Sequence, residues 1–261
     1  MNRILFEPQE VVDGEAVFGG VRAEHVMNVL HGETGQILKT GIVNGPIGTS
    51  EIVGISEGPV IRVRCTHTEE ALRPWIDLVL APPRPRVMKR LLPQLAAMGV
   101  GRIVLVGAKK VEKDFWGATL LKEENYRPLL IDGLMQAGTT VLPVLETRRN
   151  FRRFVQDELD TLFPSRNRIV AHPEVERMVE SSNGRIVESI ANHKFSLARC
   201  DSRPLLAIGP EGGWTDDEVS LLESHGFRRY SLGPRILRTD TATIALLAQL
   251  ALPPPPPSFS T

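Results

Sequence analysis

Short stretches of alternating apolar and polar residues fill the first 67 positions, separated by turns rich in Gly, Asn and Pro. A period of two predicts β-strands, and β-branched residues strengthen the prediction at 60–65. Strands are expected at 4–6, 15–18, 36–43, 51–55 and 60–65, with a short helix at 22–30. Residues 1–74 should therefore form a small β-rich, barrel-like domain that ends in a polar linker.

From residue 75 onward, apolar runs alternate with amphipathic stretches. The predicted strands are 76–81, 102–106, 141–145, 168–171, 205–208 and 229–232, and the predicted helices are 87–98, 123–136, 151–162, 215–225 and 239–252. Such alternation is typical of an α/β domain whose mostly parallel sheet is covered on both faces, here over residues 75–252. Residues 253–261 begin with five consecutive prolines, and we expect this tail to be disordered.

The charge of the chain is distributed unevenly. Its formal net charge is zero, but residues 1–74 hold only six of the 31 Lys and Arg residues against ten of the 31 Asp and Glu residues. Contacts to phosphates need Lys and Arg, so any RNA contact should depend on basic clusters after residue 74.

Several classes of protein are disfavoured. No apolar run reaches the roughly 20 residues of a membrane-spanning helix, and the N-terminus lacks the long apolar region of a secretory signal, so we expect a cytoplasmic protein. The cysteines, Cys65 and Cys200, lack the spacing of a metal site, so we expect no bound metal.

The sharpest local pattern is the loop 209–213, Gly-Pro-Glu-Gly-Gly, which joins the predicted strand 205–208 to a helix. Thr215 and Glu218 have the spacing of a capping box at the start of that helix. Glycines let the backbone approach a ligand closely, and the carboxyl ends of parallel strands are where such sheets bind ligands. The loop is neither a phosphate loop nor a GxGxxG fingerprint, and Glu211 would repel phosphate, so a neutral or cationic ligand fits better. A simple turn without a ligand is the alternative.

A second pattern lies at residues 231–242, Ser-Leu-Gly-Pro-Arg-Ile-Leu-Arg-Thr-Asp-Thr-Ala. Arg235 and Arg238 flank two apolar residues, which is unusual for a solvated edge. This arrangement indicates a functional site. An arginine pair with Asp240 that merely caps the last helix is the alternative.

Together, these motifs and their spacing resemble the 16S rRNA uracil-N3 methyltransferases of the SPOUT class. The resemblance implies a trefoil-knotted α/β domain with a small β-rich N-terminal domain of PUA- or OB-like barrel type, a homodimer formed through the knotted domain, and S-adenosylmethionine as cofactor. By motif, the implied cofactor-binding residues are Ile208, Gly209, Pro210, Glu211, Gly212, Gly213, Leu232, Gly233, Ile236, Leu237, Thr241 and Ala242.

The resemblance also implies catalytic and RNA-binding residues. Arg238 and Arg235 would hold the target phosphate or polarise the uracil carbonyls, and Asp240 or Glu211 would accept the N3 proton. The partner would be small-subunit ribosomal RNA or its particle, with the target base unpaired or flipped out. The expected RNA-binding residues are His25, Arg84, Arg86, Lys89 and Gln136.

The chain departs from the family pattern at three places. Asp240 stands where the family has Glu, residues 135–140 keep Gln136 but lack the usual Arg, and Arg84 or Arg86 replaces a Lys. Two alternatives therefore stay open: a methyltransferase of the same fold that acts on a different RNA, and a dimeric RNA-binding protein without turnover. A nicotinamide oxidoreductase is disfavoured because its fingerprint is missing.

Overall fold

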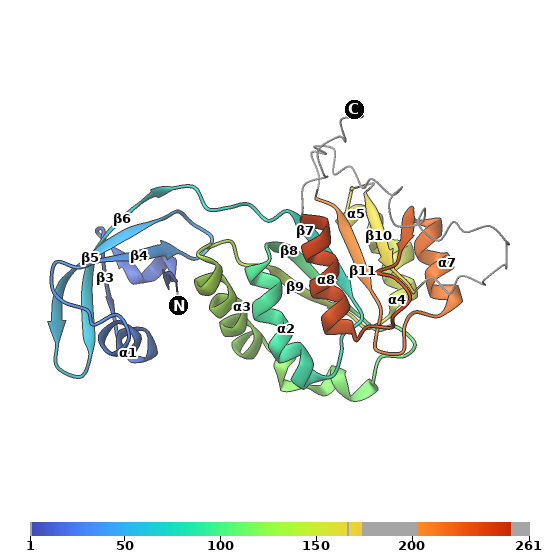
Figure 1. The fold of residues 1–261 in the computed structure, drawn as a ribbon, viewed down its shortest axis with the longest axis horizontal. Coiled ribbons are helices and arrows are strands. Elements are labelled where there is room, and N and C mark those ends of the chain that lie inside the picture. The colour runs from blue at the N-terminus through green and yellow to red at the C-terminus, as the bar shows by residue number, and fades with distance from the viewer. Residues whose placement is uncertain (1, 166, 174–202, 252–261) are drawn as a thin grey trace, which may run out of the picture. The chain divides into compact units, whose positions relative to one another are not determined.

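The computed structural model of the chain describes residues 2–165, 167–173 and 203–251 (Figure 1). The predicted tail at 253–261 lies outside them. The chain divides into two compact units. The first consists of Met1–Trp75, Lys89–Gly101 and Ala118–Val144, and the second of Ile76–Met88, Arg102–Gly117 and Leu145–Thr261.

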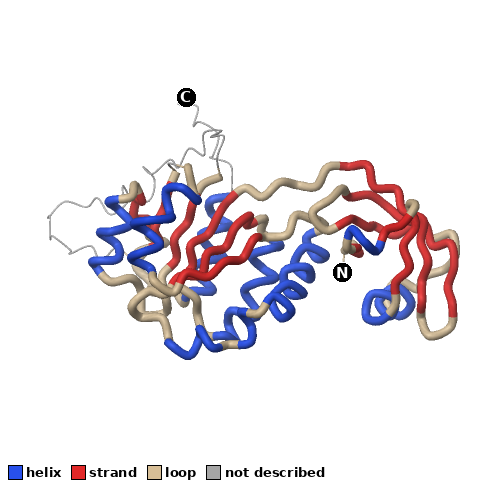
Figure 2. The backbone as a smooth tube through the Cα atoms, turned by 180° about the vertical axis from the view of Figure 1, so that it is seen from behind, coloured by secondary structure: helices blue, strands red, loops and turns tan. Residues whose placement is uncertain are grey.

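The first unit contains a six-stranded sheet in the order β1-β4-β5-β6-β3-β2. Its strands are β1 (Ile4–Phe6), β2 (Val11–Val12), β3 (Glu15–Phe18), β4 (Ile37–Ile42), β5 (Ile47–Ser56) and β6 (Val60–Glu69). β1 and β4 are parallel and the other neighbours are antiparallel, with β5 and β6 forming the longest pair (Figure 2). The sheet and helix α1 (Gly20–Asn28) bury a core that includes Phe6, Phe18 and Val26. The β-rich character of this region is confirmed, and its closure into a barrel stays a prediction.

Two further helices cross at close range in the first unit. The helix α3 (Glu123–Ala137) carries Gly133, and α2 (Pro85–Ala97) carries Pro93. A Cβ atom at Gly133 would lie 2.0 Å from the Pro93 carbonyl oxygen, so only glycine permits this approach. Short 3-10 turns also occur in this unit: η1 (Pro8–Glu10) precedes β2 and η3 (Thr119–Leu121) precedes α3, while a third, η2 (Lys113–Gly117), belongs to the second unit.

The second sheet has the strand order β12-β10-β11-β7-β8-β9. Its strands are β7 (Ile76–Leu80), β8 (Val100–Val106), β9 (Val144–Arg148), β10 (Arg168–Ala171), β11 (Leu205–Ile208) and β12 (Phe227–Tyr230). β10 is parallel to both β11 and β12, and β11 is parallel to β7. β7 and β11 are buried along their whole length, as expected for parallel strands that are covered on both faces.

Helices cover the two faces of this sheet. Val79, Leu205 and Ala207 point to the face covered by residues 151–162 and by α7 (Asp216–Ser224). Residues 151–162 form one nearly continuous helix made of α4 (Phe151–Arg153), a π-helical turn, η4 (Phe154–Glu158), and α5 (Leu159–Leu162). Strand residues of the other parity, such as Ile208, point to the opposite face. There α8 (Thr239–Ala251) packs against β11 (Figure 1).

Most predicted elements are confirmed, but some bounds were wrong. The strand expected at 141–145 runs over 144–148, because Pro143 has no N–H to donate and the Leu142 N–H donates to the Asn44 side chain instead. The strand expected at 229–232 runs over 227–230, because Phe227 is a buried core residue that pairs with Arg168. None of the helices within the described ranges has the length and apolar character that crossing a membrane requires.

The contact of Gly133 with Pro93 generates a stability prediction. Gly133→Ala should lower the free energy of unfolding by at least about 2 kcal/mol, because overpacking a tight helix crossing outweighs the gain in helix propensity. Urea unfolding followed by circular dichroism measures the change. The exposed neighbour Asp132→Ala is the control and should change stability by less than about 0.5 kcal/mol. A Gly133→Ala protein as stable as the wild type would show that the two helices move apart at little cost.

Candidate functional site

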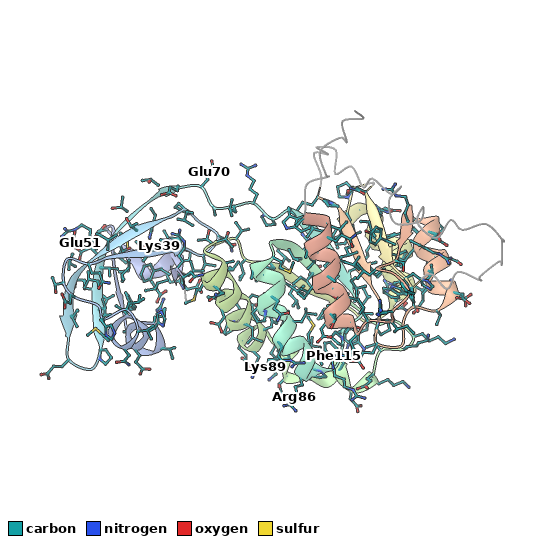
Figure 3. The ribbon with its side chains drawn as sticks, viewed as in Figure 1. Lys39, Glu51, Glu70, Arg86, Lys89 and Phe115 are labelled. Carbon is teal, nitrogen blue, oxygen red and sulfur yellow. The ribbon has the colours of Figure 1, made fainter. Side chains whose placement is uncertain are left out.

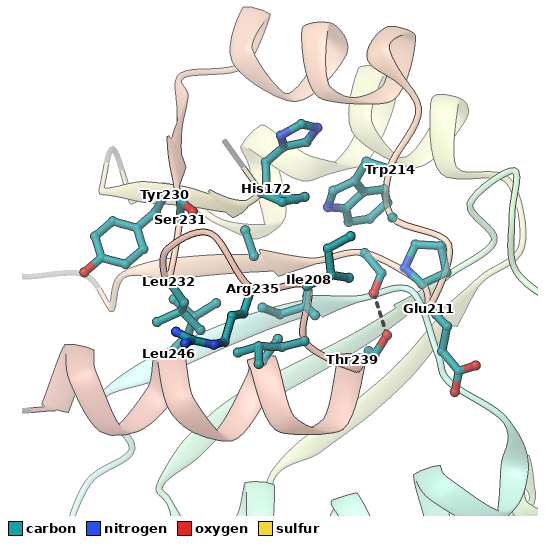
Figure 4. Close-up of a pocket in the computed structure, with 18 of the residues that line it drawn as sticks. His172, Ile208, Glu211, Trp214, Tyr230, Ser231, Leu232, Arg235, Thr239 and Leu246 are labelled. Carbon is teal, nitrogen blue, oxygen red and sulfur yellow. Dashed lines mark hydrogen bonds between the residues drawn. The ribbon is translucent and has the colours of Figure 1, made fainter. Parts of the chain in front are cut away.

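Three strand ends meet at one edge of the second sheet. Because β10 pairs in parallel with β11 and β12, the carboxyl ends of all three strands are neighbours. The backbone N–H of His172, just after β10, donates to the carbonyl of Tyr230 at the end of β12 (3.1 Å). The residues that follow these strands line a cavity of about 300 Å³ (Figure 4).

The glycine loop 209–213 forms one wall of this cavity. Its tight turn is closed by the Gly213 N–H, which donates to the Pro210 carbonyl (2.8 Å), and Gly213 has φ +69°, a conformation that favours glycine. The predicted capping box is confirmed: Thr215 N–H donates to the Glu218 carboxylate (2.9 Å), and Glu218 N–H donates to the Thr215 hydroxyl (3.4 Å). The start of α7 thus holds one end of the loop in place.

The segment after β8 holds the same loop from the other side. The Lys110 ammonium donates to the Gly212 carbonyl (2.7 Å), and the Lys109 backbone N–H donates to the Glu218 carboxylate (2.8 Å). Glu218 therefore joins two loops while it caps its own helix. These contacts fix the backbone conformation of the glycine loop. The residues that make them, Lys109, Lys110 and Glu218, do not line the cavity.

The second motif reaches the same cavity from β12. Gly233 has φ +107°, which turns the chain sharply after the strand. At the start of α8, the Thr239 hydroxyl donates to the Gly209 carbonyl (3.1 Å), while the Thr239 carbonyl accepts from the Thr243 hydroxyl (2.7 Å). Thr239 is buried, so this contact joins the two motifs directly.

Most of the cofactor-binding residues predicted from the motifs come together here. Of the predicted site residues, the cavity is lined by Ile208, Gly209, Pro210, Glu211, Gly212, Gly213, Leu232, Gly233, Arg235, Ile236, Leu237 and Ala242. Arg238, Asp240 and Thr241 belong to the second motif but do not line the cavity. What these residues bind stays a prediction at this point.

Sequence analysis missed several lining residues. They are Ala171, His172, Pro173, Trp214, Tyr230, Ser231, Thr239 and Leu246. Ala171 ends β10, His172 and Pro173 follow it, and nothing in their sequence marks them. Only the strand order places them beside the two glycine-containing turns, and that order was not predictable from local patterns.

Arg238 and Asp240 form an ion pair beside the cavity. The Arg238 guanidinium donates to the Asp240 carboxylate (3.1 Å), and the Thr241 N–H donates to the other carboxylate oxygen (3.0 Å). Burial raises the pKa of Asp240, but these hydrogen bonds outweigh burial and hold the pKa below its ordinary value. A carboxylate with a lowered pKa is a weak base. Asp240 is therefore better suited to orienting Arg238 than to accepting a proton.

Glu211 faces a different electrostatic environment. It lines the large cavity and also a small adjacent one, of about 40 Å³, together with Arg84 and Lys110. Arg84 donates to the Glu112 carboxylate (2.9 Å), and the negative charges of Glu112 and Glu211 both raise the pKa of the Arg84 guanidinium. Arg84, predicted to contact RNA, therefore lies at the edge of the same site.

The other predicted RNA-binding residues line neither cavity. Arg86 and Lys89 are exposed one turn apart on α2 (Figure 3). Gln136 is exposed near the end of α3, where its carbonyl accepts from the Asn2 side chain (2.6 Å). The Nε2 atom of His25 is buried and has no hydrogen-bond partner among the residues described. RNA binding by these four residues stays a prediction. In the described part of the chain, no three His, Cys, Asp or Glu side chains cluster as a metal site would require.

Comparison with known proteins shows what the chain is similar to. The family described as RNA methyltransferase domain matches residues 70–251. Ribosomal RNA small subunit methyltransferase E of Treponema pallidum is 32% identical over 255 residues, which cover 95% of this chain and 90% of that protein.

Solved structures share the fold. A Legionella pneumophila protein, solved with bound S-adenosylmethionine, has a TM-score of 0.70 at 23% identity and covers 95% of this chain and 96% of its own. Ribosomal RNA small subunit methyltransferase E from Neisseria gonorrhoeae, also bound to S-adenosylmethionine, has a TM-score of 0.69 at 20% identity and covers 96% of both chains.

The contact between the two motifs can be tested by removing one hydroxyl. Thr239→Val keeps the shape of the side chain but leaves the Gly209 carbonyl without this donor, so the free energy of unfolding should fall by about 1–2 kcal/mol. Hydrogen exchange at residues 209–213 should also become faster. Thr241→Val, at an exposed position two residues on, is the matched control and should change neither quantity measurably. Equal stability and exchange in both variants would contradict the role given to Thr239.

Proposed function

The chain belongs to the RNA methyltransferase domain family and is a relative of the ribosomal RNA small subunit methyltransferase E proteins, and on this premise we propose that it methylates small-subunit ribosomal RNA with S-adenosylmethionine. The acceptor that we propose is N3 of a uridine. The observation that carries the proposal is the cavity at the ends of β10, β11 and β12, where both motifs meet.

The cavity suits such a cofactor. Its volume, about 300 Å³, is at the lower end of the range of small-molecule sites, which is roughly 300–1,000 Å³. Ile208, Leu246 and Trp214 supply apolar walls for a flat purine ring, and the glycine loop leaves backbone groups open to the polar edges of the ligand. Glu211 lies at the cavity as a counter-charge for a cationic ligand.

The chemistry requires little of the protein beyond alignment and proton removal. When bound, S-adenosylmethionine supplies a methyl group that is already activated on a sulfonium. The acceptor nitrogen gains a bond to the methyl carbon and loses its proton, while the bond from sulfur to that carbon breaks. The protein must therefore hold the uracil in line with the methyl group and stabilise the N3 anion. Because N3 lies on the pairing edge, the base must be unpaired or flipped out.

We assign the positioning of the uridine to the two arginines. Arg235 lines the cavity, and Arg238 is exposed beside it, oriented by Asp240. The two guanidinium groups can hold the phosphate of the target nucleotide or polarise the uracil carbonyls. Polarised carbonyls favour loss of the N3 proton. The low pKa of Asp240 makes it a poor base, so we assign proton acceptance to Glu211, whose side chain is exposed and lies at the cavity.

We further propose that residues 1–74 form an RNA-binding domain and that His25, Arg84, Arg86, Lys89 and Gln136 contribute to RNA contact. Arg84 is the best supported of these, since its small cavity shares Pro210 and Glu211 with the larger one. The location that follows from a ribosomal RNA substrate is the cytoplasm.

The remaining proposals concern the knot and the dimer. We propose a trefoil knot in residues 75–252 on the family resemblance, and the hydrogen bond from Thr239 to Gly209 shows that the segments after β11 and β12 meet, as they would in such a knot. Two consecutive apolar residues, Ile236 and Leu237, are 85% and 36% exposed, and adjacent exposed apolar residues of this kind support the proposed homodimer through this domain.

Methyl transfer itself is the first test. The protein should transfer the tritiated methyl group of S-adenosylmethionine to unmodified small-subunit RNA, or to small-subunit particles, and mass spectrometry should locate one labelled uridine methylated at N3. Label found on a large-subunit or transfer RNA would favour the different-RNA alternative. Cofactor binding with no labelled RNA of any kind would favour a binding protein without turnover.

The role of Arg238 is the second test. Arg238→Ala should lower the rate of methyl transfer by about 100-fold or more, because it removes a cation from the acceptor site. The affinity for S-adenosylmethionine, measured by calorimetry, should stay within about two-fold, since Arg238 does not line the cavity. The control is Arg153→Ala, which removes another exposed arginine paired with an aspartate and should leave the rate unchanged. Parallel loss of rate and cofactor affinity in Arg238→Ala would show that its role is misassigned.

A further inference from the structure

Trp214 holds a buried hydrogen-bond donor in the wall of the cavity. Only 5% of the residue is exposed, and its indole Nε1 has no hydrogen-bond partner among the described residues. Buried donors without an acceptor are rare, because a group that loses water without gaining a partner costs free energy. An unpaired donor at a cavity therefore points to an acceptor that arrives with a ligand.

The surroundings of the ring fix its orientation. The indole packs against Phe151, with ring centroids 5.1 Å apart and an interplanar angle of 34°. On another side it approaches Gly209 so closely that a Cβ there would lie 3.2 Å from Nε1. Figure 4 shows the indole nitrogen on the side of the ring toward Ile208 and His172, which also line the cavity.

Two other side chains show why this donor is distinctive. The indole of Trp75 is satisfied, since its Nε1 donates to the Met98 carbonyl (2.7 Å). His25 also has an unpartnered buried nitrogen, but that atom can be the unprotonated one of a neutral imidazole, and His25 does not line the cavity. An indole nitrogen is always a donor, so Trp214 has no such alternative.

We propose that Trp214 is a cofactor-binding residue whose Nε1–H donates a hydrogen bond to an acceptor atom of bound S-adenosylmethionine. The inference rests on the proposed function, because it takes that ligand as the occupant of the cavity. The ligand offers acceptors on its purine ring, ribose and carboxylate. Trp214 thereby adds a directional side-chain hydrogen bond to the site. The glycine loop offers the ligand mainly backbone groups.

The first experiment observes this contact without altering the protein. The chain has three tryptophans, so a ¹⁵N-labelled sample has three indole N–H signals. Each is assigned from its loss in Trp75→Phe, Trp116→Phe or Trp214→Phe. On addition of S-adenosylhomocysteine, which binds without turnover, the Trp214 proton should move downfield, as a proton that gains an acceptor does. The Trp75 signal, already hydrogen-bonded to Met98, should stay in place.

The second experiment measures what the contact contributes. Trp214→Phe keeps an aromatic wall but removes the donor, and its Kd for S-adenosylhomocysteine should rise by about five- to ten-fold. Trp116→Phe, which does not line the cavity, is the matched control and should bind like the wild type. Calorimetry gives both constants.

The outcomes separate this inference from the proposed function. If the wild type binds S-adenosylhomocysteine while the Trp214 signal stays in place, or if Trp214→Phe binds as tightly as the wild type, the inference is overturned and the proposed function stands. A wild-type protein that binds neither S-adenosylhomocysteine nor S-adenosylmethionine would overturn the proposed function and this inference with it.

Discussion

The parallel pairing of β10 with β11 on one side and β12 on the other is the constraint on which the site depends. Parallel strands end at the same edge of a sheet, so this order brings three chain segments, distant in sequence, to one place. Each segment leaves its strand with few bulky side chains, and the space between them remains open as the cavity. Another strand order would separate the two motifs, even with every local turn unchanged.

Hydrogen bonds to backbone carbonyls then hold the turns in place. The Thr239 hydroxyl and the Lys110 ammonium each donate to a carbonyl of the glycine loop, at Gly209 and Gly212. Lys110 makes its contact from outside the cavity, whereas Thr239 makes its contact from the cavity wall, and both restrict the backbone of the loop. Glu218 adds to this by capping α7 and accepting from the Lys109 N–H. A loop that is rich in glycine would otherwise retain considerable backbone freedom, and a binding site gains affinity when that freedom is removed before the ligand arrives.

Local sequence patterns were sufficient for most of the elements and for the two motifs, because these depend on neighbours within a few residues. The capping box at Thr215 and the strand at 205–208 are examples. The contribution of His172 was not predictable, because it depends on which strands are adjacent, a property of the whole sheet. Trp214 was missed for a related reason: its position after the glycine loop does not show where its indole N–H lies, and only the structure shows that this N–H has no partner within the described chain.

The surroundings of Asp240 favour one of the two roles that its sequence leaves open, the orientation of an arginine. One oxygen of its short carboxylate accepts from the Thr241 N–H at the start of α8, and the other accepts from Arg238. Both contacts stabilise the charged form, and together they outweigh the effect of burial on its pKa. A group stabilised as the anion gains little by taking a proton, so the same contacts that make Asp240 a good support for an arginine make it a poor base. The proposed mechanism therefore assigns proton acceptance to Glu211, which is exposed and lies at the cavity.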